Sequence, residues 1–147
     1  MSADFEKLIG MFIHQCGALE LLTNNCIRAF ATDRLLSTDA IKSSFSKRII
    51  LLRKLLDERS DINKDEIANI CDELKKISEK RNIVAHNPIM STKPDGSGTQ
   101  EILVLRYSPS EVTIPNKLAK EDIAKLLGQT TKLLKKFGES IPESTET

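Results

Sequence analysis

The chain has 147 residues, of which 39% are hydrophobic and 29% charged, so its length and composition fit one soluble globular domain. Its formal net charge of +1 is too balanced to predict nucleic-acid binding from bulk electrostatics, and any RNA contact must come from a local patch. The first residues lack the basic and apolar regions of a signal peptide, and no apolar run approaches the roughly 18 residues of a membrane span. A cytoplasmic location, away from membranes, is therefore the default expectation.

The cysteines and histidines do not suggest a metal site. The three cysteines, Cys16, Cys26 and Cys71, share no short ligand spacing, and there are only two histidines. We therefore predict no metal or other cofactor, and we expect the cysteines to pack as small apolar side chains. His14 falls in the middle of a predicted helix, where a structural or interfacial role is the simplest expectation.

The first predicted helix covers residues 3–30, where apolar side chains recur at helical spacing over about eight turns. Its main stripe begins at Phe5 and ends at Phe30. A second, weaker stripe consists of Met11, Ala18, Leu21 and Leu22. Two apolar faces on one helix suggest packing on two sides, against the core and against a partner subunit.

A second helix is expected to begin at the capping residues Ser37, Thr38 and Asp39 and to end near Arg59. Its apolar face carries Ile41, Phe45, Ile49, Leu52, Leu55 and Leu56. Its other face carries Lys42, Lys47, Arg53 and Lys54, which form either a solvated surface or one wall of a binding site.

A third helix is expected from a cap at Asp61 or Asn63 to about His86. It cannot run much further, because the residue before Pro88 avoids the α region. Its apolar stripe is Ile67, Ile70, Cys71, Leu74 and Ile77.

The rest of the chain contains a short β excursion and a last helix. Residues 101–107 are typical of a strand, with further extended pieces at 112–114 and 90–92, and the last helix should run from about 120 to 137 with Gly138 as its stop. Together the elements predict an all-α fold, a four- or five-helix up-and-down bundle with a short β-hairpin at 88–115 between the third and fourth main helices. Residues 1–140 form a single domain, and residues 141–147 form a flexible tail.

The third helix closes with the sequence Arg81-Asn82-Ile83-Val84-Ala85-His86-Asn87-Pro88. Arg81 lies seven residues after Leu74 and four after Ile77, so it points along the apolar stripe, where a charge is costly unless it is paired. It is therefore either half of a structural ion pair, for which Glu20 is a candidate partner, or part of a site.

His86 is a candidate general acid or base, since imidazole titrates near neutral pH, although a histidine at a helix end also serves as a cap. Asn82 precedes His86 by four residues and shares its helix face, so its amide can orient the imidazole or a phosphate oxygen. Arg81 and His86 are five positions and about 140° apart around a helix. Their convergence on one phosphate needs the reach of arginine, a distorted last turn or a second subunit.

The motif resembles that of the HEPN domains (higher eukaryotes and prokaryotes nucleotide-binding), in which an arginine and a histidine are separated by a few residues, often with a polar residue after the arginine. Arg81 and His86 fit with four residues between them, and Asn82 supplies the polar residue. The expected bundle, from about residue 3 to 138 with the motif at the end of its third main helix, is similar as well.

The resemblance implies a metal-independent endoribonuclease in which the ribose 2′-OH attacks the adjacent phosphate. By resemblance, His86 would transfer protons, Arg81 would stabilise the phosphorane, and Asn82 would orient His86 or the phosphate. The expected substrate-binding residues are Lys76, Lys80 and Asn87. The resemblance also implies a homodimer that brings two motifs together and a toxin or defence effector, with an antitoxin protein as a further partner.

Two other functions stay open. A domain of the same type can bind a nucleotide, RNA or a protein without cutting. A purely structural helical adaptor, in which Arg81 pairs with a carboxylate such as that of Glu20, predicts that Arg81→Ala unfolds the protein.

Overall fold

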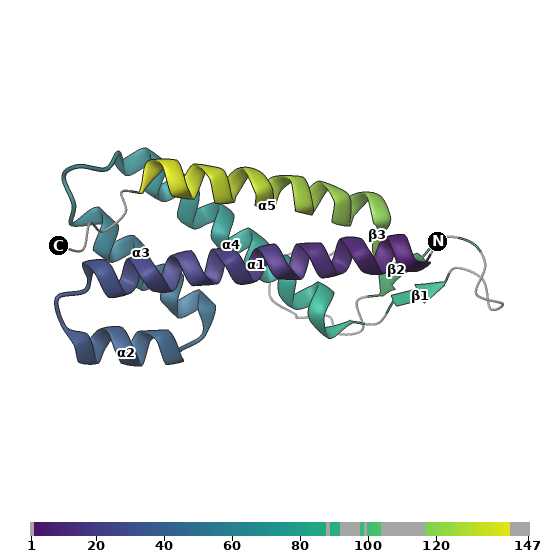
Figure 1. The fold of residues 1–147 in the computed structure, drawn as a ribbon, viewed down its shortest axis with the longest axis horizontal. Helices are drawn as coiled ribbons and strands as arrows, with labels where there is room; N and C mark the ends of the chain where they lie inside the picture. Colours follow the sequence, from purple (N-terminus) through teal and green to yellow (C-terminus); the bar gives the residue numbers. More distant parts are fainter. Residues whose placement is uncertain (1, 88, 92–97, 99, 104–116, 142–147) are drawn as a thin grey trace.

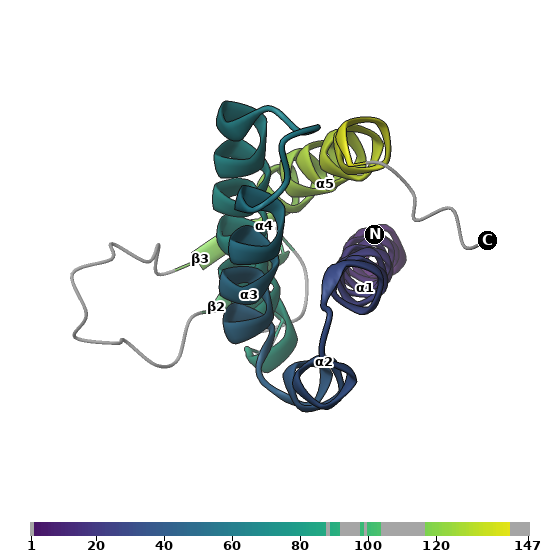
Figure 2. The ribbon, with the colours of Figure 1, turned by 90° about the vertical axis from the view of Figure 1, so that its left-hand side faces the viewer.

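The computed structural model describes residues 2–87, 89–91, 98, 100–103 and 117–141. The helices α1 (Ser2–Phe30), α3 (Phe45–Asp57), α4 (Lys64–His86) and α5 (Lys120–Ser140) form an elongated bundle, and the short α2 (Arg34–Lys42) lies beside the end of α1 (Figure 1, Figure 2). α1 packs against each of the other helices, and α4 packs against α3 and α5. The mostly helical structure agrees with the expected all-α class.

The core follows the predicted apolar stripes. The largest fully buried side chains are Phe5, Phe12, Leu19, Ile27, Leu52, Leu56, Ile67, Ile70, Leu74, Ile102, Ile123 and Phe137. Burial of one such side chain contributes about 1.5–3 kcal/mol, so packing between helices, more than intrinsic propensity, stabilises the bundle. The cysteines are free thiols, with Cys16 and Cys71 buried, which confirms that they pack as apolar side chains.

The predicted boundaries of α4 are confirmed. Asn63 caps its start, because the side-chain oxygen accepts hydrogen bonds from the backbone N–H groups of residues 65 and 66, at 2.8 and 3.3 Å. At the other end Asn87 has extended backbone, with φ −121° and ψ 145°, just before Pro88 in the sequence. The Asn87 amide nitrogen donates to the carbonyl oxygen of Ile83 at 2.7 Å, so this side chain is part of the helix end.

The second predicted helix is wrong in one respect, because residues 34–57 form two helices. α2 begins after Asp33, whose carboxylate accepts a hydrogen bond from the N–H of Leu35 at 2.9 Å, so residues 37–39 lie inside α2 and do not cap it. A break follows at Ser44, which has extended backbone (φ −60°, ψ 153°) and accepts from the N–H of Lys47 at 3.4 Å. Serine hydroxyls compete for backbone hydrogen bonds in this way, and the result is a cap for α3.

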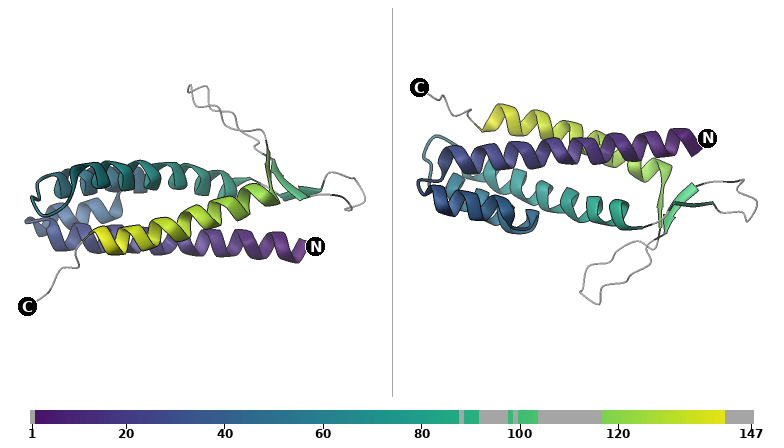
Figure 3. Two further views of the ribbon diagram at one scale, coloured as in Figure 1. Left: turned by 90° about the horizontal axis from the view of Figure 1, so that it is seen from above. Right: turned by 60° about the horizontal axis from the view of Figure 1, so that its bottom comes forward.

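Three short strands, β1 (Ile89–Ser91), β2 (Gln100–Leu103) and β3 (Lys117–Ala119), form an antiparallel sheet in the order β1-β2-β3. The sheet lies at the end of the bundle where α1 begins (Figure 3). Ile102 is opposite Ile89 on one side and Leu118 on the other, and both Ile102 and Leu118 are buried. The expected β excursion is thus present, but it is a three-stranded sheet, and its unpredicted third strand leads directly into α5. The extended piece expected at 112–114 lies outside the described residues.

The end of α5 also differs from the prediction. The helix continues through Gly138 to Ser140, because Phe137 and Ile141 on either side are both buried in the core. Ile141 therefore belongs to the domain, and the rest of the expected tail lies outside the described residues. Among the helices that the structure describes, none is long and apolar enough to cross a membrane.

Candidate functional site

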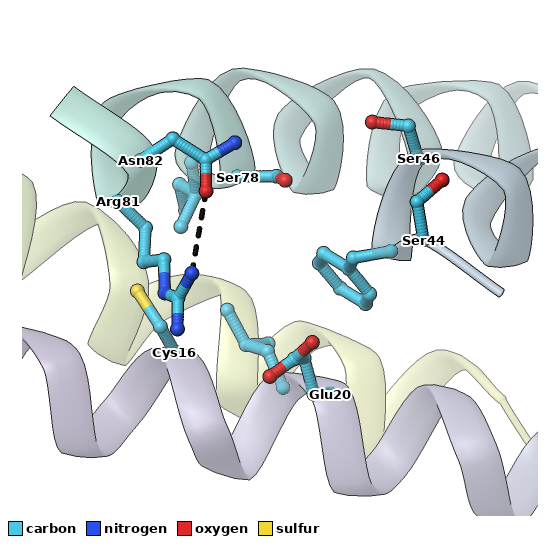
Figure 4. A pocket seen from close by; sticks show the side chains of 10 residues that line it. Cys16, Glu20, Ser44, Ser46, Ser78, Arg81 and Asn82 are labelled. Atoms are coloured by element: carbon cyan, nitrogen blue, oxygen red, sulfur yellow. Dashed lines mark hydrogen bonds between the residues drawn. The ribbon is translucent and has the colours of Figure 1, made fainter. Parts of the chain in front are cut away.

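A pocket forms where α3 is shorter than the helices beside it. α3 has 13 residues and α4 has 23, or about 20 and 35 Å of helix, so the last turns of α4 extend beyond the start of α3. The pocket lies at this step, between α1, the start of α3 and the second half of α4 (Figure 4). It has a volume of about 210 Å³ and is lined by Cys16, Leu19, Glu20, Ser44, Phe45, Ser46, Ile77, Ser78, Arg81 and Asn82.

Arg81 is the cation of this pocket. Its side chain is half-buried, and its Nη1 donates to Oδ1 of Asn82 at 3.3 Å, the contact drawn in Figure 4. Within the described part of the chain, no carboxylate oxygen lies within 4.0 Å of the Arg81 guanidinium. The ion pair with Glu20, which was one candidate for the structural alternative, is therefore not present in this structure. A half-buried arginine without a carboxylate partner is available to bind an external anion.

Glu20 pairs with Arg48 instead. Nη2 of Arg48 donates to Oε1 of Glu20 at 2.9 Å, and Nη1 of Arg48 donates to Oδ1 of Asn24 at 2.8 Å. The Arg48 side chain is only 12% exposed, and its guanidinium lies 5.2 Å from the ring centroid of Phe45, close enough for a cation–π contact. This network holds the Glu20 carboxylate in the wall of the pocket, away from pairing with Arg81.

The Arg48 network was missed by sequence reasoning. Arg48 is three residues after Phe45 and four before Leu52, so it points along the apolar stripe of its helix. A cation on an apolar stripe is the sequence feature that identified Arg81, and the same feature would have identified Arg48. Its buried Nε has no hydrogen-bond partner among the described residues.

The structure does not bring His86 into the pocket. α4 stays helical through His86, so the angle of about 140° between Arg81 and His86 remains. His86 is exposed one turn beyond Asn82, outside the residues that line the pocket. Of the predicted site residues, only Arg81 and Asn82 lie together.

The predicted substrate-binding residues also lie outside this pocket. Lys76 is exposed and Lys80 is partly exposed on α4, and neither lines the pocket. Asn87 acts in the C-terminal cap of α4.

The Cys16 thiol lines the pocket as an uncharged group. Its pKa is raised to about 12, chiefly by burial, which outweighs the lowering effect of the nearby Arg81 charge and is assisted by Glu20. Because the thiolate is the nucleophilic form, Cys16 is protonated and unreactive near neutral pH. The described residues contain no group of three or more histidine, cysteine or acidic side chains placed to hold a metal ion.

The arrangement is suited to binding rather than to acid–base chemistry within one chain. The Arg81 guanidinium and the Asn82 amide can hold a phosphate, and the hydroxyls of Ser44, Ser46 and Ser78 supply further hydrogen bonds. Proton transfer needs His86, which a single chain leaves outside. The pocket thus contains groups suited to an anion, and His86 lies about one helical turn beyond Asn82, outside the lining residues.

Comparisons with known proteins add no relative. No protein-family model matches the chain, and no curated protein and no solved structure is significantly similar to it. The function of the chain is therefore inferred from its own residues.

Proposed function

We propose that this protein is a metal-independent endoribonuclease of the HEPN type, which cleaves RNA through Arg81, Asn82 and His86. The observation that carries the proposal is the guanidinium of Arg81, which has no carboxylate partner among the described residues and lies half-buried in a pocket beside Asn82, with an exposed histidine at the end of the same helix. An arginine with no carboxylate partner is suited to a phosphate diester, because its planar fork matches two phosphate oxygens.

In this proposal the ribose 2′-OH attacks the adjacent phosphorus. The bond from phosphorus to the 2′-oxygen forms, and the bond to the 5′-oxygen of the next nucleotide breaks. His86 accepts the proton of the 2′-OH and delivers it to the leaving 5′-oxygen, so that a 2′,3′-cyclic phosphate and a 5′-OH result. Arg81 stabilises the charge that develops on the phosphorane, and Asn82 holds the guanidinium in place.

A second copy of the chain supplies what one chain lacks. His86 lies outside the pocket, so a homodimer in which the partner's His86 approaches Arg81 would complete the site. The second apolar stripe of α1 does not serve this purpose. Met11 and Leu21 are 43% and 59% exposed, but Met11 is nine residues, about 180°, from Glu20 on α1. The dimer contact is therefore expected around the end of α4.

A second candidate function is a binding module that holds RNA or a nucleotide without cutting it. It is favoured by the position of His86 outside the pocket that contains Arg81 and Asn82. In that case the pocket binds phosphate, and no proton-transfer group meets it.

Cleavage of a mixed pool of total RNA and tRNA in EDTA tests the proposal. We expect the wild type to produce 2′,3′-cyclic phosphate ends and His86→Ala to produce none. His14→Ala is the matched control, because His14 is the other histidine and is exposed on α1, and it should cleave like the wild type. Cleavage by folded His86→Ala would exclude His86 from the reaction. RNA binding without cleavage by the folded wild type would establish the binding module.

A further inference from the structure

The pocket carries a cation and an anion at separate places. Arg81 and Asn82 lie at one end, Ser44 and Ser46 lie towards the other, and Glu20 lies on α1 between them (Figure 4). A polyanion lying along the pocket would therefore be attracted at Arg81 and repelled at Glu20. The matching ligand has an anionic group at one end only.

Glu20 is a fixed acceptor with one oxygen free. Its Oε1 is held by Arg48 at 2.9 Å, and Arg48 is itself held by Asn24 at 2.8 Å. No donor among the described residues reaches its Oε2, and the side chain is 35% exposed. The carboxylate is thus oriented by the protein and ready to accept hydrogen bonds from a ligand.

The space between the two ends suits a flat ring. Leu19, Phe45 and Ile77 supply apolar walls, and the volume is about 210 Å³. Proteins that read single-stranded RNA insert an unstacked base against aromatic and apolar side chains and hydrogen-bond its edge. A nucleotide has the required anion, ring and polar edge.

We propose that the pocket receives one unstacked nucleotide of the RNA, with its phosphate on Arg81 and its base edge on Glu20, and that Glu20 selects guanine. The inference rests on the proposed function, in which Arg81 binds an RNA phosphate. Guanine presents two adjacent donors, N1–H and N2–H, and the carboxylate can accept one on the free Oε2 and the other on the remaining lone pair of Oε1. Adenine and cytosine place a lone-pair nitrogen beside their amino group, and uracil flanks its single N–H with two carbonyl oxygens, which a carboxylate repels.

The test is the binding of the four nucleoside 3′-monophosphates, and of inorganic phosphate, to the full chain by isothermal titration calorimetry. We expect guanosine 3′-monophosphate to bind at least about fivefold more tightly than the uridine compound. Glu20→Gln should bring the two within about twofold without changing the Kd of inorganic phosphate. Glu79→Gln, which changes an exposed carboxylate outside the pocket, should keep the wild-type ratio. Arg81→Ala should weaken all four nucleotides equally.

The ratio of two Kd values in one protein does not depend on the fraction of molecules that is folded, so a less stable Glu20→Gln still gives a decisive result. Equal binding of all four nucleotides by the wild type, or an unchanged ratio in Glu20→Gln, would overturn the role of Glu20 and leave phosphate binding at Arg81 intact. Failure of every nucleotide and of phosphate to bind would overturn both. Cleavage of the RNA pool without a preference for guanine would support the ribonuclease and reject the base selection.

Discussion

Arg48 and Arg81 lie close to the same pocket, yet their replacement by alanine should affect stability very differently. Arg48→Ala removes two hydrogen bonds of a charged donor, at 2.8 and 2.9 Å, and the contact with Phe45. Hydrogen bonds to charged groups contribute about 1.5–3 kcal/mol each, and an exposed cation–π contact contributes about 0.5–1 kcal/mol. Because Glu20 is 35% exposed and water can replace part of the loss, we expect the free energy of unfolding to fall by about 2–4 kcal/mol.

Arg81→Ala removes far fewer stabilising contacts than Arg48→Ala. Its one hydrogen bond, to the exposed Asn82, is 3.3 Å long, and no carboxylate in the described residues is left without its partner. The loss of apolar packing along its side chain remains, so the expected destabilisation is no more than about 1 kcal/mol.

Urea unfolding followed by far-ultraviolet circular dichroism measures both values, provided that the slope of free energy against urea stays constant between variants. A loss for Arg81→Ala as large as that for Arg48→Ala would refute the reasoning. Arg81 would then be part of a structural network, as in the helical-adaptor alternative, and its guanidinium would not be free to bind phosphate.

Three further predictions concern the fold. Asn63→Ala, which removes the cap of α4, should lower the free energy of unfolding by about 1 kcal/mol in the same urea assay, and an unchanged midpoint would contradict the cap. Phe12→Ala should cost about 3–5 kcal/mol, since the ring is fully buried, and a loss below about 1 kcal/mol would place it outside the core. Burial raises the pKa of Cys16 to about 12 and those of Cys26 and Cys71 to about 11, above the ordinary 9.0. The folded state therefore retains these protons, and stability should fall as pH rises above about 9, by at most about 4 kcal/mol per pH unit. Urea unfolding in reducing buffer at several pH values checks this pH dependence. Changing each cysteine to alanine should make the free energy of unfolding fall less steeply with pH.

Most of the helical architecture was predictable because long apolar stripes at helical spacing have few other solutions. α1 and α4 begin and end within about two residues of their predicted bounds, since their stripes are long and α4 has a clear cap and a following proline. The break between α2 and α3 was not predictable in this way. Ile41, Phe45 and Ile49 keep the helical spacing across it, and only the side-chain cap at Ser44 shows that the helix stops.

The sheet, too, was only partly predictable from the sequence. β2 could be recognised from its apolar residues. β3 has only three residues and runs directly into α5, so no separate strand pattern marks it in the sequence. Such a strand is stabilised by its pairing with β2, from Glu101 opposite Ala119 to Leu103 opposite Lys117, and pairing is a property of the tertiary structure.

The sequence by itself determined the helical class, the apolar core and the residue types of the candidate site. It identified Arg81 as a cation on a core-facing stripe. Such a cation is either half of a structural ion pair or part of a binding site. Only the tertiary structure shows that Glu20 is bound by Arg48, 28 residues away in the chain and on another helix, and not by Arg81. Which charges neutralise each other depends on how the helices pack, and among the residues that the structure describes that packing leaves Arg81 without a carboxylate partner and His86 outside the pocket.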